Sequence, residues 1–434
     1  MFGKHYQAHH NCESIFSVDP RPIKFGEGAS KELGYEAKSR QMLTVAIFSD
    51  EITITLPPAL VALESLNAVG VAYQIYSKAR VEPTDQSFLD ACRFLDQGTF
   101  DGIVSIGGGS VIDTAKAANL LHCHPADLMD YVNKPLGKGL PVPGKLLPHI
   151  ACPTTSGTGS ESTGVAVFDL VKQEVKTGMS SSFMKPDMGI IDPEFTWNLP
   201  PLVTAATGFD VLTHAIESYT AVPFSLRPAA TDPALRPPYQ GANPYSDIGS
   251  LQAIRLASDY LLRAVNDPGD HEARSAMMYA ATLAGISFGN AGVHIPHAMS
   301  YSVAGMIRDY FPEGWPKDHS MCPHGISVVV NAPAAFRFSG EVYPERHWKA
   351  AEALGAEMQG VPIENGGEAL ALRMIELMRA CGIPNGLKAL NYSDKDIPSL
   401  VEGAYKQQRL LINSPREASK SNLAVIYQNA MQYW

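Results

Sequence analysis

The stretch IVSIGGGSVIDTAK, residues 103–116, joins a buried-strand pattern to a helix pattern through three consecutive glycines. Ile103–Ile106 is a short apolar run, and the residues from Val111 onward have apolar side chains at helical spacing. Because the glycines leave no side chain at the turn, phosphate oxygens can approach the first backbone N–H groups of the helix. The stretch therefore predicts a dinucleotide pyrophosphate site, although a tight structural turn explains a lone GGGS equally well. The predicted contacts are Gly108, Gly109 and Ser110.

Strand and helix patterns alternate around this stretch. Thr44–Phe48 predicts a strand and Leu56–Leu66 a helix, and this rhythm indicates βαβ units with a largely parallel sheet. From about Asp192 onward, stretches rich in Ala, Leu and Met at helical spacing replace the strand patterns. The sequence thus predicts an α/β dinucleotide-binding domain over residues 1–195 and an all-α domain over residues 196–434.

The composition is that of a globular protein. Hydrophobic residues make up 45% and charged residues 18% of the 434 residues, and the formal net charge of -10 is unfavourable for nucleic acid or anionic lipid. No apolar run approaches the roughly 20 residues of a membrane helix. The six cysteines are scattered, as is typical of reduced thiols, and the amino terminus shows no apolar or Arg-rich targeting pattern. We therefore expect a cytoplasmic protein without nucleic-acid or membrane partners.

Four polar side chains are further candidates for the dinucleotide site. Asp50 ends the Thr44–Phe48 strand, where a carboxylate can accept a hydrogen bond from a ribose 2′-OH and repel a 2′-phosphate, which favours NAD over NADP. A helix N-cap or turn residue is the competing interpretation of Asp50. Asp113 follows the glycines by one helical turn, and Thr154 and Thr155 supply hydroxyls after another strand.

Histidines and one aspartate in the second half indicate a metal site. Asp210 and His214 are four residues apart and so share a helix face, and His294, His297 and His324 follow in two further segments. One carboxylate with imidazoles suits Fe(II) or Zn(II). For any single one of these residues, a helix-surface or buried structural histidine is the more frequent explanation.

Five motifs occur in order along nearly the whole chain: GGGSVIDTAK, PTTSGTGSE, GFDVLTHAIESY, HAMSY and CPHG. Together they resemble the iron-dependent (group III) alcohol dehydrogenase family. Segments such as RPPYQGANPYSDI and FGNAGVH resemble its hydroxyacid–oxoacid transhydrogenase branch. The resemblance implies a Rossmann-like dinucleotide-binding domain followed by an all-α metal-binding domain, a dehydroquinate synthase-like fold.

By position, the resemblance implies that Lys176 joins the NAD site and that four residues bind the metal ion. The implied metal ligands are Asp210, His214, His297 and His324. Members of the family often have a histidine four residues after the third ligand, proposed to move the alcohol proton, but this chain has Tyr301 there. A tyrosine is a weak base at neutral pH unless a nearby cation favours its charged form. Tyr301, His294 or a chain of waters are therefore the candidates for proton transfer.

The implied function is NAD-linked, metal-dependent hydride transfer between an alcohol and a carbonyl, of the 4-hydroxybutyrate and 2-oxoglutarate type. A simple NAD-dependent alcohol dehydrogenase or aldehyde reductase is the alternative, and a non-catalytic NAD-binding sensor is an alternative of another class. Anionic substrates need a local cation, and Arg227 and Arg236, in the Pro-rich segment after the first metal-ligand pair, are candidates. We also expect a homodimer or larger homo-oligomer.

Overall fold

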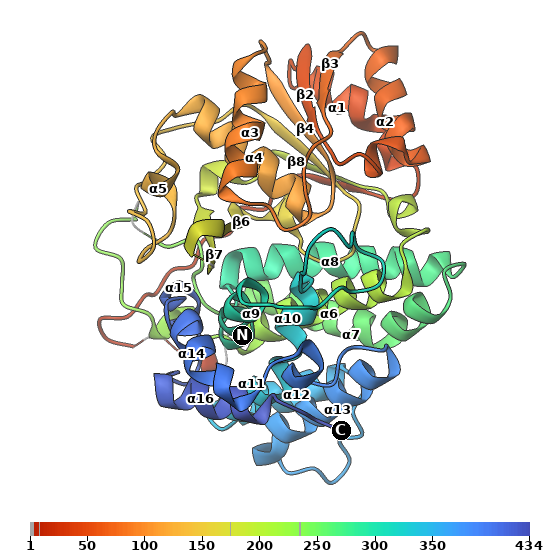
Figure 1. The fold of residues 1–434 in the computed structure, drawn as a ribbon. Coiled ribbons are helices and arrows are strands. Elements are labelled where there is room, and N and C mark those ends of the chain that lie inside the picture. Colours follow the sequence, from red (N-terminus) through yellow and green to blue (C-terminus); the bar gives the residue numbers. More distant parts are fainter. Residues whose placement is uncertain (1–3, 8, 174, 234–235) are drawn as a thin grey trace. The chain divides into compact units, whose positions relative to one another are not determined.

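The computed structural model describes residues 4–7, 9–173, 175–233 and 236–434 (Figure 1). The chain divides into two compact units. Residues Pro20–Leu199 form the α/β unit, and Pro200–Trp434 form the helical unit together with the described residues before Pro20. This division differs from the expected one mainly at the start of the chain. The reason is side-chain packing: the Tyr6 hydroxyl donates to Asp247 at 2.5 Å, and the Tyr6 ring stacks on Phe224.

A six-stranded sheet forms the centre of the α/β unit, in the order β1-β8-β5-β4-β2-β3. All of its neighbouring strands are parallel, as the sequence predicts. The strands are β1 (Ile23–Phe25), β2 (Thr44–Phe48), β3 (Ala72–Tyr76), β4 (Gly102–Gly107), β5 (His149–Pro153) and β8 (Met188–Ile191).

Helices cover both faces of this sheet (Figure 1). Because side chains alternate along a strand, Val45 and Ile47 of β2 belong to one apolar cluster, and Ala46 and Phe48 belong to another. The first cluster includes α1 (Leu33–Ser39) and α2 (Pro57–Ala68), and the second includes α3 (Asp85–Asp96) and α4 (Gly109–Cys123). The unit therefore has the doubly covered parallel sheet expected of a dinucleotide-binding domain.

An antiparallel hairpin is added to this unit, which the sequence patterns did not predict. It consists of β6 (Val165–Leu170) and β7 (Val175–Ser180). The unit also contains the short helix α5 (Leu128–Tyr131). The backbone N–H of Val167 donates to Asp113 of α4 at 2.9 Å, which ties the hairpin to that helix.

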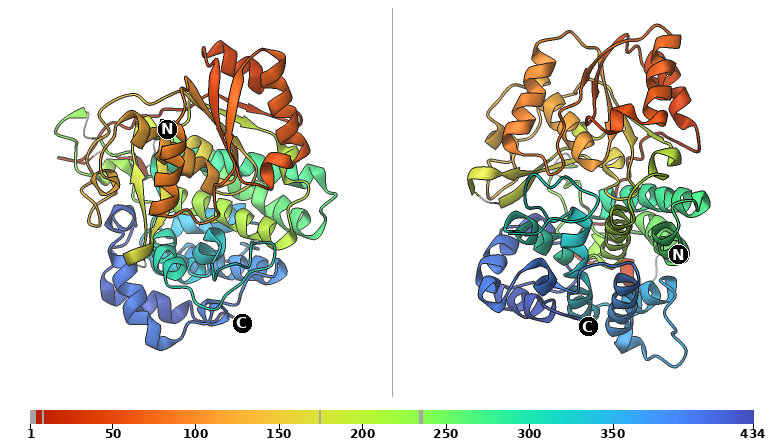
Figure 2. Two further views of the ribbon diagram at one scale, coloured as in Figure 1. Left: turned by 45° about the horizontal axis from the view of Figure 1, so that its top comes forward. Right: turned by 45° about the vertical axis from the view of Figure 1, so that its right-hand side comes forward.

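The helical unit contains α6 (Pro201–Thr220), α7 (Pro244–Asn266) and α8 (His271–Ala291), which pack against one another (Figure 2). Nearly all of α6 is buried, which agrees with its mostly apolar sequence. The remaining helices are α9 (Ile295–Gly305), α10 (His324–Val329), α11 (Ala332–Gly340), α12 (Pro344–Ala353), α13 (Gly366–Ala380), α14 (Ile397–Tyr405), α15 (Gln408–Leu411) and α16 (Lys420–Asn429). The expected fold class, α/β followed by all-α, is confirmed. Within the described residues, we find no helix that combines the length and the apolarity needed to span a bilayer.

Candidate metal centre and dinucleotide site

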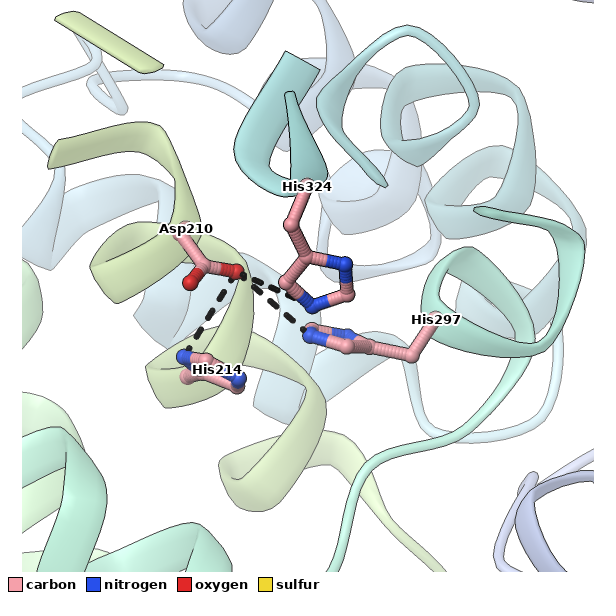
Figure 3. A group of neighbouring side chains, drawn as sticks. All are labelled: Asp210, His214, His297 and His324. Atoms are coloured by element: carbon pink, nitrogen blue, oxygen red, sulfur yellow. Dashed lines mark ion pairs between the residues drawn. The ribbon is translucent and has the colours of Figure 1, made fainter. Parts of the chain in front are cut away.

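Three helices of the helical unit bring one carboxylate and three imidazoles together (Figure 3). Asp210 and His214 lie one turn apart on α6, His297 lies in the first turn of α9, and His324 begins α10. Asp210 Oδ1 lies 3.8 Å from His214 Nδ1, 3.6 Å from His297 Nε2 and 3.7 Å from His324 Nε2. One ligand atom from each of the four residues lies within 4.8 Å of all the others. The expected set is therefore a real cluster in space.

The cluster has the properties of a cation site. Asp210 Oδ1, His214 Nδ1 and His297 Nε2 are buried and have no hydrogen-bond partner among the described residues. Burying such polar atoms costs free energy unless a hydrogen bond or an ion of opposite charge compensates them. With metal–ligand bonds near 2.1 Å, two ligands at tetrahedral corners lie about 3.4 Å apart, close to the separations here. One carboxylate oxygen with three imidazole nitrogens is a donor set that divalent Fe and Zn accept.

Glu217, which the sequence analysis did not single out, orients one of the imidazoles of the cluster. It is fully buried on α6 and accepts from His297 Nδ1 in a short hydrogen bond, while its other oxygen accepts from the backbone N–H of His294 at 2.8 Å. A proton held on Nδ1 leaves the lone pair of His297 Nε2 free to face the cluster. Positions 210, 214 and 217 share one helix face, and this spacing could have identified Glu217 from the sequence.

Gly325 allows His324 to reach Asp210. A Cβ atom at Gly325 would lie 1.9 Å from the backbone oxygen of Ala206 and 3.2 Å from Asp210 Cβ. Only glycine permits this approach of α10 to α6. The CPHG motif thus supplies both an imidazole of the cluster and the small residue that places it.

The pKa values in the cluster follow from burial and mutual contact. Burial lowers the pKa of His214 to about 3. Burial would also raise the pKa of Asp210, but the imidazoles of His214, His324 and His297 together hold it well below its usual range. For His297, burial is outweighed by Glu217 and Asp210, which raise its pKa to about 9. Without a metal ion, the cluster therefore holds a proton on His297 that a cation would displace.

The two candidates for proton transfer differ in their surroundings. His294 is fully buried, its Nε2 lies 3.1 Å from Thr220 Oγ1, and burial lowers its pKa to about 4. Tyr301 is one turn beyond His297 on α9, and its hydroxyl lies 3.5 Å from Arg409 Nη2. Tyr301 is thus the candidate that has a cation beside it.

The two arginines proposed for substrate binding already have partners within the helical unit. Arg227 Nη1 donates to Asn413 Oδ1 at 2.6 Å, and Arg236 Nε pairs with Glu13 Oε2 at 3.2 Å. The Arg236 pair is only partly exposed, so this cation is largely neutralised where it lies.

In the α/β unit, the expected dinucleotide residues Asp50, Gly108 and Thr154 follow neighbouring strands near the point where the sheet reverses its order. From β2 the chain passes to β3 on one side and later to β4 on the other. Ligands of open α/β sheets bind at such a switch point, beyond the carboxyl ends of the strands. Ser49 Oγ, after β2, donates to the carbonyl of Ile106 in β4 at 2.7 Å, so the two strand ends are adjacent.

The glycine loop begins α4, and no side chain caps this helix. A second loop lies against it: the backbone N–H of Thr154 donates to Gly107 at 3.1 Å, and a Cβ at Gly108 would touch Thr155 at 3.4 Å. A Cβ at Gly109 would lie 2.5 Å from the Thr158 side chain. The predicted glycines and threonines therefore lie side by side around the start of α4.

Three other predicted cofactor residues have contacts inside the unit. Asp50 Oδ1 accepts from the backbone N–H groups of Ile52 and Thr53 at 3.0 and 2.8 Å, which is the turn role considered above. Asp113 accepts from the Ser160 hydroxyl as well as from the hairpin backbone, so it holds loops in place. Lys176 pairs with Glu82 and, at 3.0 Å, with Asp169.

Family models match most of the chain. The model described as "Iron-containing alcohol dehydrogenase" matches residues 20–193, and the one described as "Fe-containing alcohol dehydrogenase family, C-terminal" matches residues 239–431. The chain is 46% identical to the hydroxyacid-oxoacid transhydrogenase, mitochondrial, of Rattus norvegicus, with 96% of this chain and 90% of that protein covered. It is 45% identical to the protein of the same name from Homo sapiens, with the same coverage.

Solved structures agree with this result. A structure of 1,3-propanediol oxidoreductase matches with a TM-score of 0.83 at 27% identity, covering 96% of this chain and 100% of that one. A sulfoacetaldehyde reductase from Bifidobacterium kashiwanohense, in complex with NAD+, matches with a TM-score of 0.78 at 26% identity, covering 96% and 99%.

The expected cytoplasmic location is wrong, because relatives at 42–46% identity over nearly the whole chain are named mitochondrial. The physical reason is that import is an address read by receptors, so composition and core packing carry no information about it.

The family models and the named relatives show that this protein is an enzyme and not a non-catalytic sensor. The metal cluster, the glycine loop and both family models point to metal-dependent alcohol oxidoreductase chemistry. The chain belongs to the iron-containing alcohol dehydrogenase family and groups with its hydroxyacid–oxoacid transhydrogenases.

Proposed function

We propose that this enzyme is a hydroxyacid–oxoacid transhydrogenase that uses a tightly held NAD and one Fe(II) or Zn(II) per subunit. The observation that carries the proposal is 42–46% identity to proteins of that name over nearly the whole chain. The buried cluster of Asp210, His214, His297 and His324 supports the metal ion, and the family models name iron. A divalent ion would stabilise negative charge on the alcohol oxygen, and a nicotinamide would carry the hydride.

The residues of the chain prepare this reaction. Glu217 orients His297, and the burial of Asp210 strengthens its attraction for a cation. We assign proton transfer to Tyr301 or His294. Gly108, Gly109 and Ser110 offer uncapped backbone N–H groups to the pyrophosphate, and Thr154, Thr155 and Lys176 are the additional contacts that we assign to NAD.

The preference for NAD over NADP is assigned to Asp50. One of its oxygens accepts the backbone hydrogen bonds of the turn, and the other is left for a ribose hydroxyl. A 2′-phosphate there would suffer like-charge repulsion, so we expect Asp50→Gly to narrow the difference in KM between the cofactors.

In the reaction, 4-hydroxybutyrate would lose a hydride and a proton to become succinate semialdehyde. The same hydride and a proton would convert 2-oxoglutarate to 2-hydroxyglutarate, so that no external oxidant is needed. The test is to mix both acids with metal-loaded enzyme without added NAD and to follow both products by NMR. We expect equal amounts of the two products.

A simple NAD-dependent alcohol dehydrogenase or aldehyde reductase remains the second candidate, favoured by the similarity to 1,3-propanediol oxidoreductase. This second function would be the correct one if the enzyme needs stoichiometric free NAD and no 2-oxo acid can replace NAD as the hydride acceptor. Equal turnover of butanol or propanediol and 4-hydroxybutyrate would have the same meaning.

Two further proposals concern the cell. The names of the relatives support a mitochondrial location, which fractionation with an antibody to this chain would test. A homodimer or larger homo-oligomer stays a prediction that light scattering would test.

A further inference from the structure

Arg409 is an arginine of the helical unit that forms no ion pair with a carboxylate of the part of the chain that the structure describes. Among the described residues, its guanidinium has two tyrosines as neighbours: the Tyr301 hydroxyl at 3.5 Å and the Tyr239 ring, whose centroid is 5.4 Å away. Other arginines of the unit pair with carboxylates at 4.0 Å or less, namely Arg236, Arg263, Arg337, Arg346, Arg373 and Arg416. A half-buried guanidinium without a carboxylate partner can bind an anionic ligand.

The position of Arg409 relates it to the metal cluster. It lies on α15, which packs against α9. On α9, Tyr301 follows His297 by four residues, so the two side chains share a helix face about 5–6 Å apart. Arg409 therefore lies beside the residue that is one helical turn from a metal ligand.

We propose that Arg409 binds the carboxylate of the substrate while the reacting carbon lies at the metal cluster. This inference rests on the proposed function and names its specificity-determining residue. In 4-hydroxybutyrate, two methylene groups separate the carbinol carbon from the carboxylate. In 2-oxoglutarate, two methylene groups likewise separate the carbonyl carbon from the distal carboxylate. One cation at a fixed distance from the metal ion therefore recognises both substrates, and each presents its reacting carbon at the same place.

Arg227 and Arg236 are less suited to this role. The carboxylate of Glu13 already neutralises Arg236, and Arg227 is bonded to the side-chain oxygen of Asn413. Arg409 has its guanidinium between two aromatic side chains, which hold it in place without neutralising it. Planar, bidentate binding of a carboxylate is what distinguishes Arg from Lys at such a site.

The test compares Arg409→Gln, Arg409→Lys and the control Arg337→Gln, which removes a surface pair with Glu368 on α13. Substrates are 4-hydroxybutyrate, 2-oxoglutarate and the neutral 1,4-butanediol, all with metal-loaded enzyme. We expect Arg409→Gln to raise KM for both acids about tenfold to hundredfold, and the kcat/KM ratio of acid over diol to fall by at least tenfold. For Arg409→Lys, both values should lie between those of Arg409→Gln and the wild type. Arg337→Gln should match the wild type. Equal losses for acids and diol would overturn the proposal, because a merely structural arginine affects both.

A binding measurement separates this proposal from the proposed function. Glutarate has the carbon skeleton of 2-oxoglutarate but no oxo group, and its affinity for the holoenzyme can be measured by calorimetry without turnover. We expect binding to weaken at least tenfold in Arg409→Gln and not in Arg337→Gln. If the wild type fails to transfer hydride between acids but glutarate binding depends on Arg409, the transhydrogenase assignment fails and the carboxylate site stands. If wild type does not bind glutarate, or Arg409→Gln binds it equally well, the carboxylate site is wrong.

Discussion

The glycine-loop region of the α/β unit and the Asp/His cluster of the helical unit differ in which parts of the chain they offer to a ligand. Around Gly108 and Gly109, the available groups are backbone N–H groups of a helix start, which solvent can also satisfy. Around Asp210, they are buried side-chain atoms without hydrogen-bond partners among the described residues. The first region therefore does not need a bound ligand to compensate its polar groups. The second is electrostatically incomplete without a cation, so substitutions there should have larger consequences.

The largest effect is expected for Asp210→Asn, which removes the only carboxylate among the four clustered ligands. Metal content should fall from one ion per subunit to nearly none, and turnover should fall by roughly a thousandfold, since the ion supplies several kcal/mol of charge stabilisation. Elemental analysis and an activity assay on the same sample measure both. Asp259→Asn, an exposed change on α7, is the matched control. A metal-free but fully active Asp210→Asn would contradict the metal proposal.

Glu217→Gln should have the next largest effect. The glutamine would present N–H groups to His297 Nδ1 and so favour the tautomer that has its proton on Nε2, which faces the cluster. We expect metal affinity to fall about 10-fold to 100-fold with the fold retained. Competition with a chelator measures the affinity, and Glu368→Gln, at a surface ion pair, is the control. Unchanged affinity would mean that Glu217 only holds the backbone.

Two glycine substitutions compare the regions directly. At Gly325, an added Cβ meets the backbone oxygen of Ala206 at 1.9 Å, whereas at Gly109 it meets the Thr158 side chain at 2.5 Å. A side chain can turn away more easily than a backbone can move, so Gly325→Ala should cost about 1–3 kcal/mol of stability and weaken metal binding. Gly109→Ala should destabilise less and mainly raise the Kd for NADH. Gly144→Ala, with only ordinary contacts at 3.7 Å or more, is the control. If Gly109→Ala destabilised the protein more than Gly325→Ala, the proposed difference between the two regions would be wrong.

The smallest difference is expected for acid stability, because each unit contains a buried histidine bonded to a serine. His149 Nε2 lies 2.8 Å from Ser105 Oγ, and His347 Nε2 lies 2.8 Å from Ser339 Oγ. Burial lowers their pKa values to about 3 and about 4, below the ordinary value of 6.5. The folded state therefore favours the neutral rings, a contribution that is complete above pH 6.5 and is lost as pH falls toward the lowered values.

Replacing either histidine with glutamine should therefore flatten the fall in unfolding free energy between pH 6 and about pH 4.5, by up to about 1.4 kcal/mol per pH unit. Urea unfolding at several pH values measures this slope. The wild type measured under the same conditions is the reference. If only one of the two variants flattens the slope, the other histidine is protonated in the fold.

Much of the fold follows from local sequence patterns. The strand Thr44–Phe48 and the helix beginning at the glycine loop were predicted from alternation and helical spacing, since these periods are properties of the strand and helix themselves. The β6–β7 hairpin was missed. Its alternation of buried and partly buried residues is interpretable only when the partner strand and α4 are in place.

For the site, the sequence by itself determined that Asp210 and His214 share a helix face, because residues four apart always do. Histidine content made His294, His297 and His324 candidates, and motif resemblance selected His297 and His324 among them. Only the packing of α10 against α6 and α9 brought the nitrogens of these two residues to Asp210. The choice among arginines also depended on tertiary structure. Whether a guanidinium is neutralised by a carboxylate is decided by residues far apart in the sequence: Glu13 lies beside Arg236, whereas Tyr301 lies beside Arg409. Periodicity records which way a side chain faces on its own element, and only the packed fold determines what it meets there.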